Sequence, residues 1–351
     1  MDYPFLRVDL DKVRSNIRLM VDKFSDKIFR PHFKTHQSLF IGKIFKEFGV
    51  DKITVSSLRM AEYFAEDFKD ITIAIPFNIL DMERINLLSD EIVLNLLITD
   101  ISQIDFLVKN SKRALNYFIE IDNGYHRTGI DYRDTRTIDK LVNSGNENVK
   151  FVGFLTHAGN TYGAKTIESV ITISEDTNKI MFKLKEKYVN SIISIGDTPS
   201  ASVVENFHGI DELRPGNFVF YDIMQKNIGV CDYSDISVWM EAPVISRSLE
   251  RNEIVVHCGA VHLSKDFFER RGRKIFGTPF NLSDMTIIEK SYVKSLSQEH
   301  GIIYTENEEW LRNVKIGDLI GIYPVHSCLT ADAIGEYIDK NGNLIDHMKG
   351  R

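Results

Sequence analysis

The stretch "KIFRPHFKTHQSL", residues 27–39, places a short run of aromatic and β-branched residues directly before a lysine. Such a run predicts a β-strand. Lys34 follows the end of that strand and stands between His32 and His36. The residues after it, 38–48, have the spacing of an amphipathic helix. The stretch therefore predicts a strand, a loop and a helix, with Lys34 on the loop as either a solvated residue or an amine held for chemistry.

The same unit recurs along the first two thirds of the chain. We expect strands at 27–33, 53–57, 71–76, 92–97, 117–122, 151–157, 191–196 and 217–222, and helices at 38–48, 58–67, 80–89, 101–112, 132–143 and 165–187. Several strands are nearly continuous apolar runs, as in sheets covered on both faces. Eight strands separated by helices predict an α/β fold, a (β/α)8 barrel of the TIM type. A doubly wound open sheet is the alternative, and the absence of GxGxxG after the first strand disfavours its dinucleotide-binding form.

The pattern changes after about residue 232 of the sequence, where strand-like segments follow one another with few helices between them. These segments are 236–249, 253–264, 301–305 and 318–328. They predict a C-terminal β-rich domain, and the strand-like "PFLRVDL" at 4–10 is expected to join it. The predicted division is a barrel at 10–232 and a β-rich domain at 233–351 together with 1–9.

Composition restricts the classes of function. The chain has 351 residues and a net charge of −7, which argues against nucleic acid or an anionic membrane as the main partner. No basic leader precedes an apolar segment, and no apolar run approaches the ~18 residues of a membrane span. Three scattered cysteines, Cys231, Cys258 and Cys328, are too few for a disulfide framework. We expect a reduced, cytoplasmic protein.

The unusual loops would share one rim of such a barrel, because barrel enzymes carry their chemistry on loops after the strands. Lys34 follows strand one, Arg127 in "DNGYHRTG" (122–129) follows strand five, and "HAGNTYG" (157–163) follows strand six. "GDTPS" (196–200) follows strand seven, and "RPGN" (214–217) lies at the entry to or the end of strand eight. Loops after strands seven and eight often bind phosphate. A phosphate site opposite a lysine suits pyridoxal 5'-phosphate, which carries both a phosphate and an aldehyde.

The quoted loops, with "SIGDTP", "ELRPGNFVFYD" and "VHSCLTAD", resemble in order the motifs of the D-serine dehydratase/D-threonine aldolase family. These are fold-type III pyridoxal-phosphate enzymes with an alanine-racemase-like barrel. The similarity runs from about residue 3 to residue 332 of the sequence. It implies a homodimeric lyase that acts on a D-amino acid.

The resemblance also implies roles for individual residues. Lys34 matches the Schiff-base lysine, Arg127 the arginine near the cofactor, and Tyr162 a tyrosine that contacts the pyridine ring or substrate. The candidate phosphate loops contain Gly196, Asp197, Thr198, Gly216 and Asn217. His157 lies on the same rim and is a further cofactor-binding candidate, with a structural role as the alternative, as for His36.

His326 and Cys328 are the candidate metal ligands. They are two residues apart in "PVHSC", so on a strand both side chains would project to one face. Imidazole and thiolate together are favoured by Zn²⁺, and Mn²⁺ and Mg²⁺ are the alternatives. The resemblance implies a metal pair here, and its histidine–cysteine form favours elimination. Strand alternation separates His257 from Cys258, and Cys258 and Cys231 are expected to be buried.

The expected reaction is metal-assisted β-elimination of D-serine, or a related D-3-hydroxyamino acid, to pyruvate or another 2-oxo acid and ammonia. Retro-aldol cleavage of D-threonine or 3-hydroxyaspartate to glycine and an aldehyde is the alternative. A non-catalytic pyridoxal-phosphate-binding homeostasis protein is disfavoured, because it has no need of a metal-bearing β-domain. The sequence leaves the substrate side chain open, with His126, His262 and Arg273 as candidates for favouring an acidic one.

Overall fold

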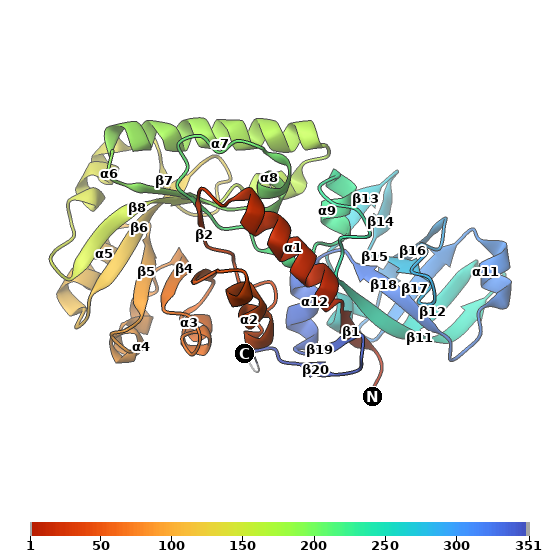
Figure 1. The fold of residues 1–351 in the computed structure, drawn as a ribbon. Coiled ribbons are helices and arrows are strands. Elements are labelled where there is room, and N and C mark those ends of the chain that lie inside the picture. The colour runs from red at the N-terminus through yellow and green to blue at the C-terminus, as the bar shows by residue number, and fades with distance from the viewer. Residues whose placement is uncertain (1, 349–351) are drawn as a thin grey trace. The chain divides into compact units, whose positions relative to one another are not determined.

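The computed structural model describes residues 2–348, and the chain divides into two compact units (Figure 1). The barrel unit consists of Ile17–Lys34 and Ile41–Phe218. The β-rich unit consists of the chain up to Asn16, the segment Thr35–Phe40, and the chain from Val219 onward. The boundary between the units therefore falls directly after Lys34. Among the described residues, no helix is both long enough and apolar enough to cross a bilayer.

Eight parallel strands form the barrel, as the sequence predicts (Figure 1). In sheet order they are β2 (Ile28–Phe29), β10 (Glu212–Leu213), β9 (Ile192–Ile195), β8 (Val149–Thr156), β6 (Leu115–Asp122), β5 (Val93–Ile98), β4 (Asp70–Pro76) and β3 (Lys52–Val55). A bridge between His32 and Thr54 joins the two ends, with the Phe33 N–H donating to the Thr54 carbonyl over 2.8 Å. A short strand, β7 (Ile130–Asp131), pairs in parallel with the end of β6.

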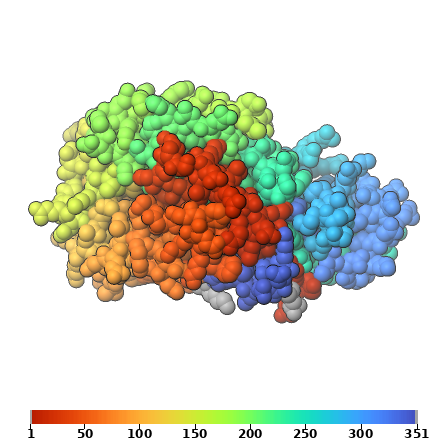
Figure 2. Space-filling model, in the orientation of Figure 1, coloured from red at the N-terminus to blue at the C-terminus, as the bar shows by residue number. Residues whose placement is uncertain are grey.

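The connecting helices cover the outside of these strands (Figure 1). They are α2 (Leu39–Glu47), α3 (Leu58–Phe64), α4 (Met82–Leu87), α5 (Ile101–Asn110), α6 (Thr135–Val142), α7 (Ile167–Lys187) and α8 (Thr198–Val203), with 3-10 turns η1 (Ile79–Asp81) and η2 (Gly159–Gly163). Side-chain caps set where several of these helices begin. Helix α5, for example, begins with a capping box formed by Asp100 and Gln103. On the face in Figure 2, the side chains of the orange segments, which belong to the barrel unit, form a continuous surface.

One helix was missing from the prediction. Helix α1 (Leu10–Lys23) buries Val13, Ile17 and Met20, which recur at helical spacing on one face. The other positions of α1 are mostly charged or polar, so its average hydropathy is low and the apolar stripe is narrow.

The predicted eighth strand at 217–222 is wrong. The eighth strand is β10, and Asn217–Val219 forms a 3-10 turn, η3. Pro215 has no N–H to donate to a sheet, which ends the strand before "RPGN". The loop 214–217 therefore lies at the carboxyl end of strand eight, on the rim where the other candidate loops were expected.

Buried charges link the strands inside the barrel unit. The Arg30 guanidinium donates to Glu212 (2.7 Å) and to Asp70 (2.6 Å), and Ser194 donates to the other oxygen of Glu212 over 2.6 Å. Ser194 in turn accepts from Arg214 Nε over 2.6 Å. This hydrogen-bond network holds Nε of the Arg214 guanidinium in place. Arg214 is the first residue of the last rim loop, 214–217.

The β-rich unit contains a nine-stranded, mostly antiparallel sheet, as the sequence predicts. Its strands are β1 (Phe5–Val8), β11 (Val238–Ser248), β12 (Glu253–His257), β15 (Gly277–Phe280), β16 (Ser291–Leu296), β17 (His300–Thr305), β18 (Leu319–Pro324), β19 (Tyr337–Asp339) and β20 (Leu344–Ile345). β1 pairs with β11 and β19, so the first strand-like segment does join this sheet. A separate hairpin is formed by β13 (Phe268–Arg270) and β14 (Arg273–Ile275). The helices are α9 (Ile223–Ile228), α10 (Ala260–Leu263), α11 (Glu308–Asn313) and α12 (Ser327–Ile334).

Candidate active site

Lys34 is exposed on the barrel rim just past β2, between buried Phe33 and buried Thr35. Its backbone N–H donates to His32 Nδ1 over 3.4 Å. Phe33 packs against the rings of Phe45, Phe64 and Phe68 with centroid distances of 5.0–5.1 Å. The backbone that carries Lys34 is thus anchored in the aromatic core while the lysine side chain remains accessible.

A cluster of positive charge surrounds His32. Burial, followed by the charges of Lys34, Arg214, His157 and Arg127, lowers the pKa of His32 well below its ordinary value. Lys34, Arg127 and His157 are candidate site residues from the sequence analysis. Each of them lowers the pKa of His32, so all three lie near the same imidazole ring. None of these four groups is a carboxylate, so the rim at His32 is a favourable environment for an anionic ligand.

His157 and Tyr162 lie beside the loop that follows β9. His157 Nδ1 donates to the Gly196 carbonyl over 2.5 Å, and the Tyr162 hydroxyl accepts the Thr198 N–H over 3.2 Å. The two rings have centroids 6.2 Å apart. The structure therefore brings together residues of the sixth and seventh rim loops that the sequence proposed for the cofactor.

The two candidate phosphate loops are also neighbours. The Phe218 N–H donates to Thr198 Oγ1 over 3.2 Å, which links the loop at 196–198 to the one at 214–217. Gly196 lies so close to Arg214 that a Cβ atom would be 2.7 Å from the Arg214 carbonyl oxygen. Only glycine fits there, which explains its place in the motif.

The contacts of Asp197 are those of a helix cap. Its carboxylate accepts the Ser200 N–H (2.7 Å) and the Thr161 hydroxyl (2.9 Å) at the start of α8. It is buried, and burial raises its pKa. A carboxylate used in this way would repel a phosphate directly, so Asp197 is better explained as the residue that shapes the loop.

Arg214 was not among the predicted site residues. It is buried, donates to the Thr156 carbonyl over 2.7 Å, and contributes to the positive charge around His32 and His157. Burial, opposed by Glu212 and Glu120, lowers its pKa to about 10. The only feature of the sequence that could have identified Arg214 as a site residue is its position directly before the Pro-Gly of "RPGN".

The titration of His157 gives a pH prediction. Burial, together with nearby Lys34, Arg127 and Arg214, lowers the pKa of His157 to about 3 although the hydrogen bond to Gly196 opposes this. In the unfolded chain a histidine titrates near 6.5, so between about pH 6.5 and 3 the unfolded state binds the extra proton. Stability therefore falls as pH drops through this window, by up to about 1.4 kcal/mol per pH unit from this residue.

Denaturant unfolding of the cofactor-free protein at several pH values between 7 and 5 would measure this slope. His157→Asn should have a shallower slope by about one proton. An equal slope in the two proteins would contradict the assignment.

His326 and Cys328 lie in the β-rich unit, but not on a strand as expected. β18 ends at Pro324, His326 is the N-cap residue of α12, and Cys328 lies in the first turn of that helix. The strand argument for a shared face was therefore wrong, because the chain turns from strand to helix at this point. The pair still meets: the side chains of His326 and Cys328 are hydrogen-bonded to each other.

Asp266 completes this arrangement and was missed by the sequence analysis. His326 Nδ1 donates to Asp266 Oδ2 over 2.8 Å, and Cys328 Sγ lies 3.3 Å from Thr35 Oγ1. Burial opposes charge on the ring, but Asp266 and Cys328 together raise the pKa of His326 to about 11. Burial likewise opposes the thiolate, but His326 lowers the pKa of Cys328. An imidazole oriented by a carboxylate, beside a thiolate, is a donor set that fits a zinc ion.

Another histidine cluster lies at the far end of β12. His257, His262 and Glu299 bring ligand atoms within 4.8 Å of one another. However, His262 Nδ1 accepts the Gly259 N–H over 3.1 Å, so the proton of the neutral ring is on Nε2, which is 3.8 Å from Glu299. A metal would need the lone pair of that nitrogen. The cluster is therefore better suited to pairing with the Glu299 charge than to binding a metal.

Comparison with known proteins gives two family matches. Residues 8–223 match the alanine racemase N-terminal domain, and residues 237–338 match the putative serine dehydratase domain. The D-serine dehydratase of Dictyostelium discoideum is 32% identical, over 91% of this chain and 88% of its own length.

Two further proteins extend the likeness. The D-threo-3-hydroxyaspartate dehydratase of Delftia sp. is 26% identical over 96% of this chain and 93% of its own. An alanine racemase-like protein from Idiomarina loihiensis has a solved structure with a TM-score of 0.90 and 28% identity, covering 100% of this chain and 98% of that one. The chain belongs to the D-serine dehydratase family of enzymes, with an alanine-racemase-type barrel.

Proposed function

We propose that this enzyme is a pyridoxal-phosphate-dependent lyase that eliminates the β-hydroxyl of D-serine or a related D-3-hydroxyamino acid. The observation that carries the proposal is the accessible Lys34 amine on a rim where Arg127 and Arg214 supply positive charge beside His32 and His157. The dehydratases of Dictyostelium discoideum and Delftia sp., named above, support the choice of reaction and of substrate class.

The rim residues fit the cofactor. Arg127 and Arg214 suit its anionic groups, and backbone amides at Gly196, Thr198, Gly216 and Asn217 would hold its phosphate. The Tyr162 ring, beside His157, would bound the plane of the pyridine. When bound, pyridoxal 5'-phosphate accepts the electron pair that remains at Cα after a proton is removed.

Lys34 has two tasks in this proposal. Its amine would hold the cofactor in the resting enzyme, and the same amine, once free, would take up the proton from Cα of the substrate. Loss of that proton and of the β-hydroxide leaves an enamine acid, 2-aminoacrylate in the case of D-serine. Tautomerisation and hydrolysis then give pyruvate and ammonium, so the water that is lost is taken up again.

In the β-rich unit, His326 Nε2 and the Cys328 thiolate would hold a zinc ion, whose Lewis acidity assists departure of a β-hydroxyl. A cysteine-to-alanine variant of the Delftia enzyme has been solved in a metal-free form. Asp266 keeps the Nδ1 proton of His326 on the far side of the ring, which leaves the Nε2 lone pair available.

Asp266→Asn tests that orienting role. Loss of the carboxylate should weaken zinc binding by about 10–100-fold, because the imidazole loses its charge partner. Zinc titration of the metal-stripped protein measures this, and excess zinc should restore turnover of D-serine. Asp284→Asn, which changes a carboxylate that bonds only to Thr286, is the matched control. Unchanged zinc affinity in Asp266→Asn would contradict the assignment.

The products that the enzyme forms from D-threonine distinguish elimination from retro-aldol cleavage. Elimination gives 2-oxobutanoate and ammonia, whereas retro-aldol cleavage gives glycine and acetaldehyde. We expect the 2-oxo acid, because the histidine–thiolate pair suits departure of hydroxide. Glycine as the main product would transfer the proposal to the aldolase branch.

We further propose a homodimer in a reducing, cytoplasmic setting. No disulfide joins the three cysteines in the described chain, and the thiolate proposed as a zinc ligand needs a reducing compartment. Sedimentation of the purified enzyme tests the dimer.

A further inference from the structure

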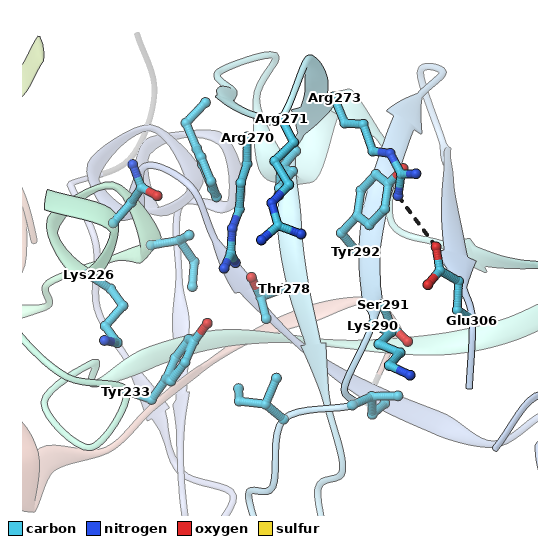
Figure 3. A pocket seen from close by; sticks show the side chains of 16 residues that line it. Lys226, Tyr233, Arg270, Arg271, Arg273, Thr278, Lys290, Ser291, Tyr292 and Glu306 are labelled. Atoms are coloured by element: carbon cyan, nitrogen blue, oxygen red, sulfur yellow. Dashed lines mark ion pairs between the residues drawn. The ribbon is translucent and has the colours of Figure 1, made fainter. Parts of the chain in front are cut away.

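A pocket of about 830 Å³ opens in the β-rich unit beside the β13–β14 hairpin (Figure 3). All the residues that line it belong to this unit, and none is proposed above to hold the cofactor or the metal; Arg273 alone was named from the sequence, as a candidate for favouring an acidic substrate. Its volume falls in the range of pockets that bind small molecules, roughly 300–1,000 Å³.

The charge of this pocket is strongly one-sided. Five cationic side chains line it, Lys226, Arg270, Arg271, Arg273 and Lys290, against the single carboxylate of Glu306. Glu306 pairs with Arg273 over 3.6 Å, and Lys226 pairs with Asp232 over 3.1 Å. Within residues 2–348, Arg270, Arg271 and Lys290 form no ion pair. This concentration of cations occurs in a chain whose net charge is −7.

The backbone holds these cations together at a cost. Arg270 and Arg273 are directly opposite each other in the antiparallel hairpin, where like charges repel. Arg271 and Lys290 have φ angles of 53° and 55°, in the left-handed region that favours glycine. Figure 3 shows the guanidinium groups of Arg270 and Arg271 pointing down from the hairpin toward Thr278. A bound anion would offset the repulsion between these cations.

The rest of the pocket wall is suited to an organic body. Tyr233 and Tyr292 are half-buried on opposite sides of it (Figure 3), and Ile275 and Ile288, which also line it, are buried. In Figure 3, Thr278 lies below the guanidinium groups of Arg270 and Arg271, and Ser291 lies beside Lys290. A ligand with anionic groups at one end and a flat or apolar body at the other would match both parts.

We propose that this pocket binds a small organic polyanion that carries at least two phosphate or carboxylate groups. The guanidinium groups of Arg270 and Arg271 bind the anionic groups, because their paired N–H donors match phosphate and carboxylate oxygens. The tyrosine-lined wall holds the remainder of the ligand. The site is additional to the proposed lyase activity and does not depend on it.

Calorimetric titration of the pyridoxal-phosphate-loaded enzyme with ADP, inorganic pyrophosphate and citrate tests the proposal. Saturating the enzyme with pyridoxal 5'-phosphate keeps these probes out of the site proposed for the phosphate of the cofactor. We expect at least one probe to bind, with affinity that falls as salt rises. Preference for ADP or pyrophosphate assigns phosphate as the ligand group, and preference for citrate assigns carboxylate.

Two variants place the binding in this pocket. Arg271→Gly with Lys290→Gly removes two charges at positions where glycine relieves the backbone, so folding stability should be unchanged or raised. Arg270→Gln removes the third unpaired charge. Each should weaken binding by about 10-fold or more. Lys274→Gln changes the same hairpin but a side chain outside the pocket lining, and should alter affinity by no more than about twofold.

The proposal is overturned if none of the three probes binds at millimolar concentration. It is equally overturned if the double glycine variant and Arg270→Gln bind the probe as tightly as the unaltered enzyme, or if Lys274→Gln weakens binding as much as they do.

Discussion

Replacing Lys34 by alanine is expected to reduce turnover of D-serine by about 10³-fold or more, because in the proposed mechanism one amine both binds the cofactor and removes the α-proton. The visible absorbance of the bound cofactor should be lost in the same variant. Lys34 is exposed, so the variant should fold and melt like the unaltered protein. Assays of pyruvate formation and thermal unfolding measure the two effects separately.

Two further variants sharpen this result. Lys34→Arg keeps the positive charge near His32 but offers a guanidinium that is a poor nucleophile, so it should be as inactive as the alanine variant. Lys43→Ala removes an exposed lysine on α2 and should be fully active. Activity in Lys34→Arg would show that charge alone is needed and would contradict the covalent role.

Cys328→Ser is expected to abolish stoichiometric zinc binding and to lower turnover of D-serine by more than about 100-fold. A serine hydroxyl stays protonated where the thiol next to His326 ionises, so the donor set loses its charge. Metal content by mass spectrometry and pyruvate formation are the measurements. A chelator should inactivate the unaltered enzyme, and added zinc should restore it.

Cys231→Ser is the matched control, because Cys231 is a buried thiol whose pKa is raised by burial, not lowered. Its metal content and turnover should be unchanged. Full activity of Cys328→Ser, or of the chelated enzyme, would contradict a metal role for this pair.

The barrel could be predicted because its strands are local patterns. β4, β5 and β6 are mostly apolar runs, since both faces of a barrel strand are covered, and the predicted ranges differ from the observed ones by two residues or fewer. β10 could not be predicted in this way. It is two residues long, and its Glu212 is buried only because Arg30, 182 residues away, neutralises it.

Site residues that lie in recognisable sequence motifs could be predicted, whereas residues that depend on partners far away in the sequence could not. Lys34 and Tyr162 lie in recognisable loops, and the histidine–cysteine pair was found although its local structure was wrong. Asp266 lies 60 residues from His326, and no spacing rule connects them. Arg214 is held by Ser194 and Thr156, 20 and 58 residues away. The roles of the individual site residues, and the domain division at 10–232 and 233–351, remain predictions.

The most direct test of the central claim is to identify the residue that carries the cofactor. The enzyme loaded with pyridoxal 5'-phosphate is treated with borohydride, which makes the bond between cofactor and amine permanent, and the peptides are then sequenced by mass spectrometry. We predict a single modified peptide with the cofactor on Lys34. Modification of a different lysine, or of none, would contradict the account.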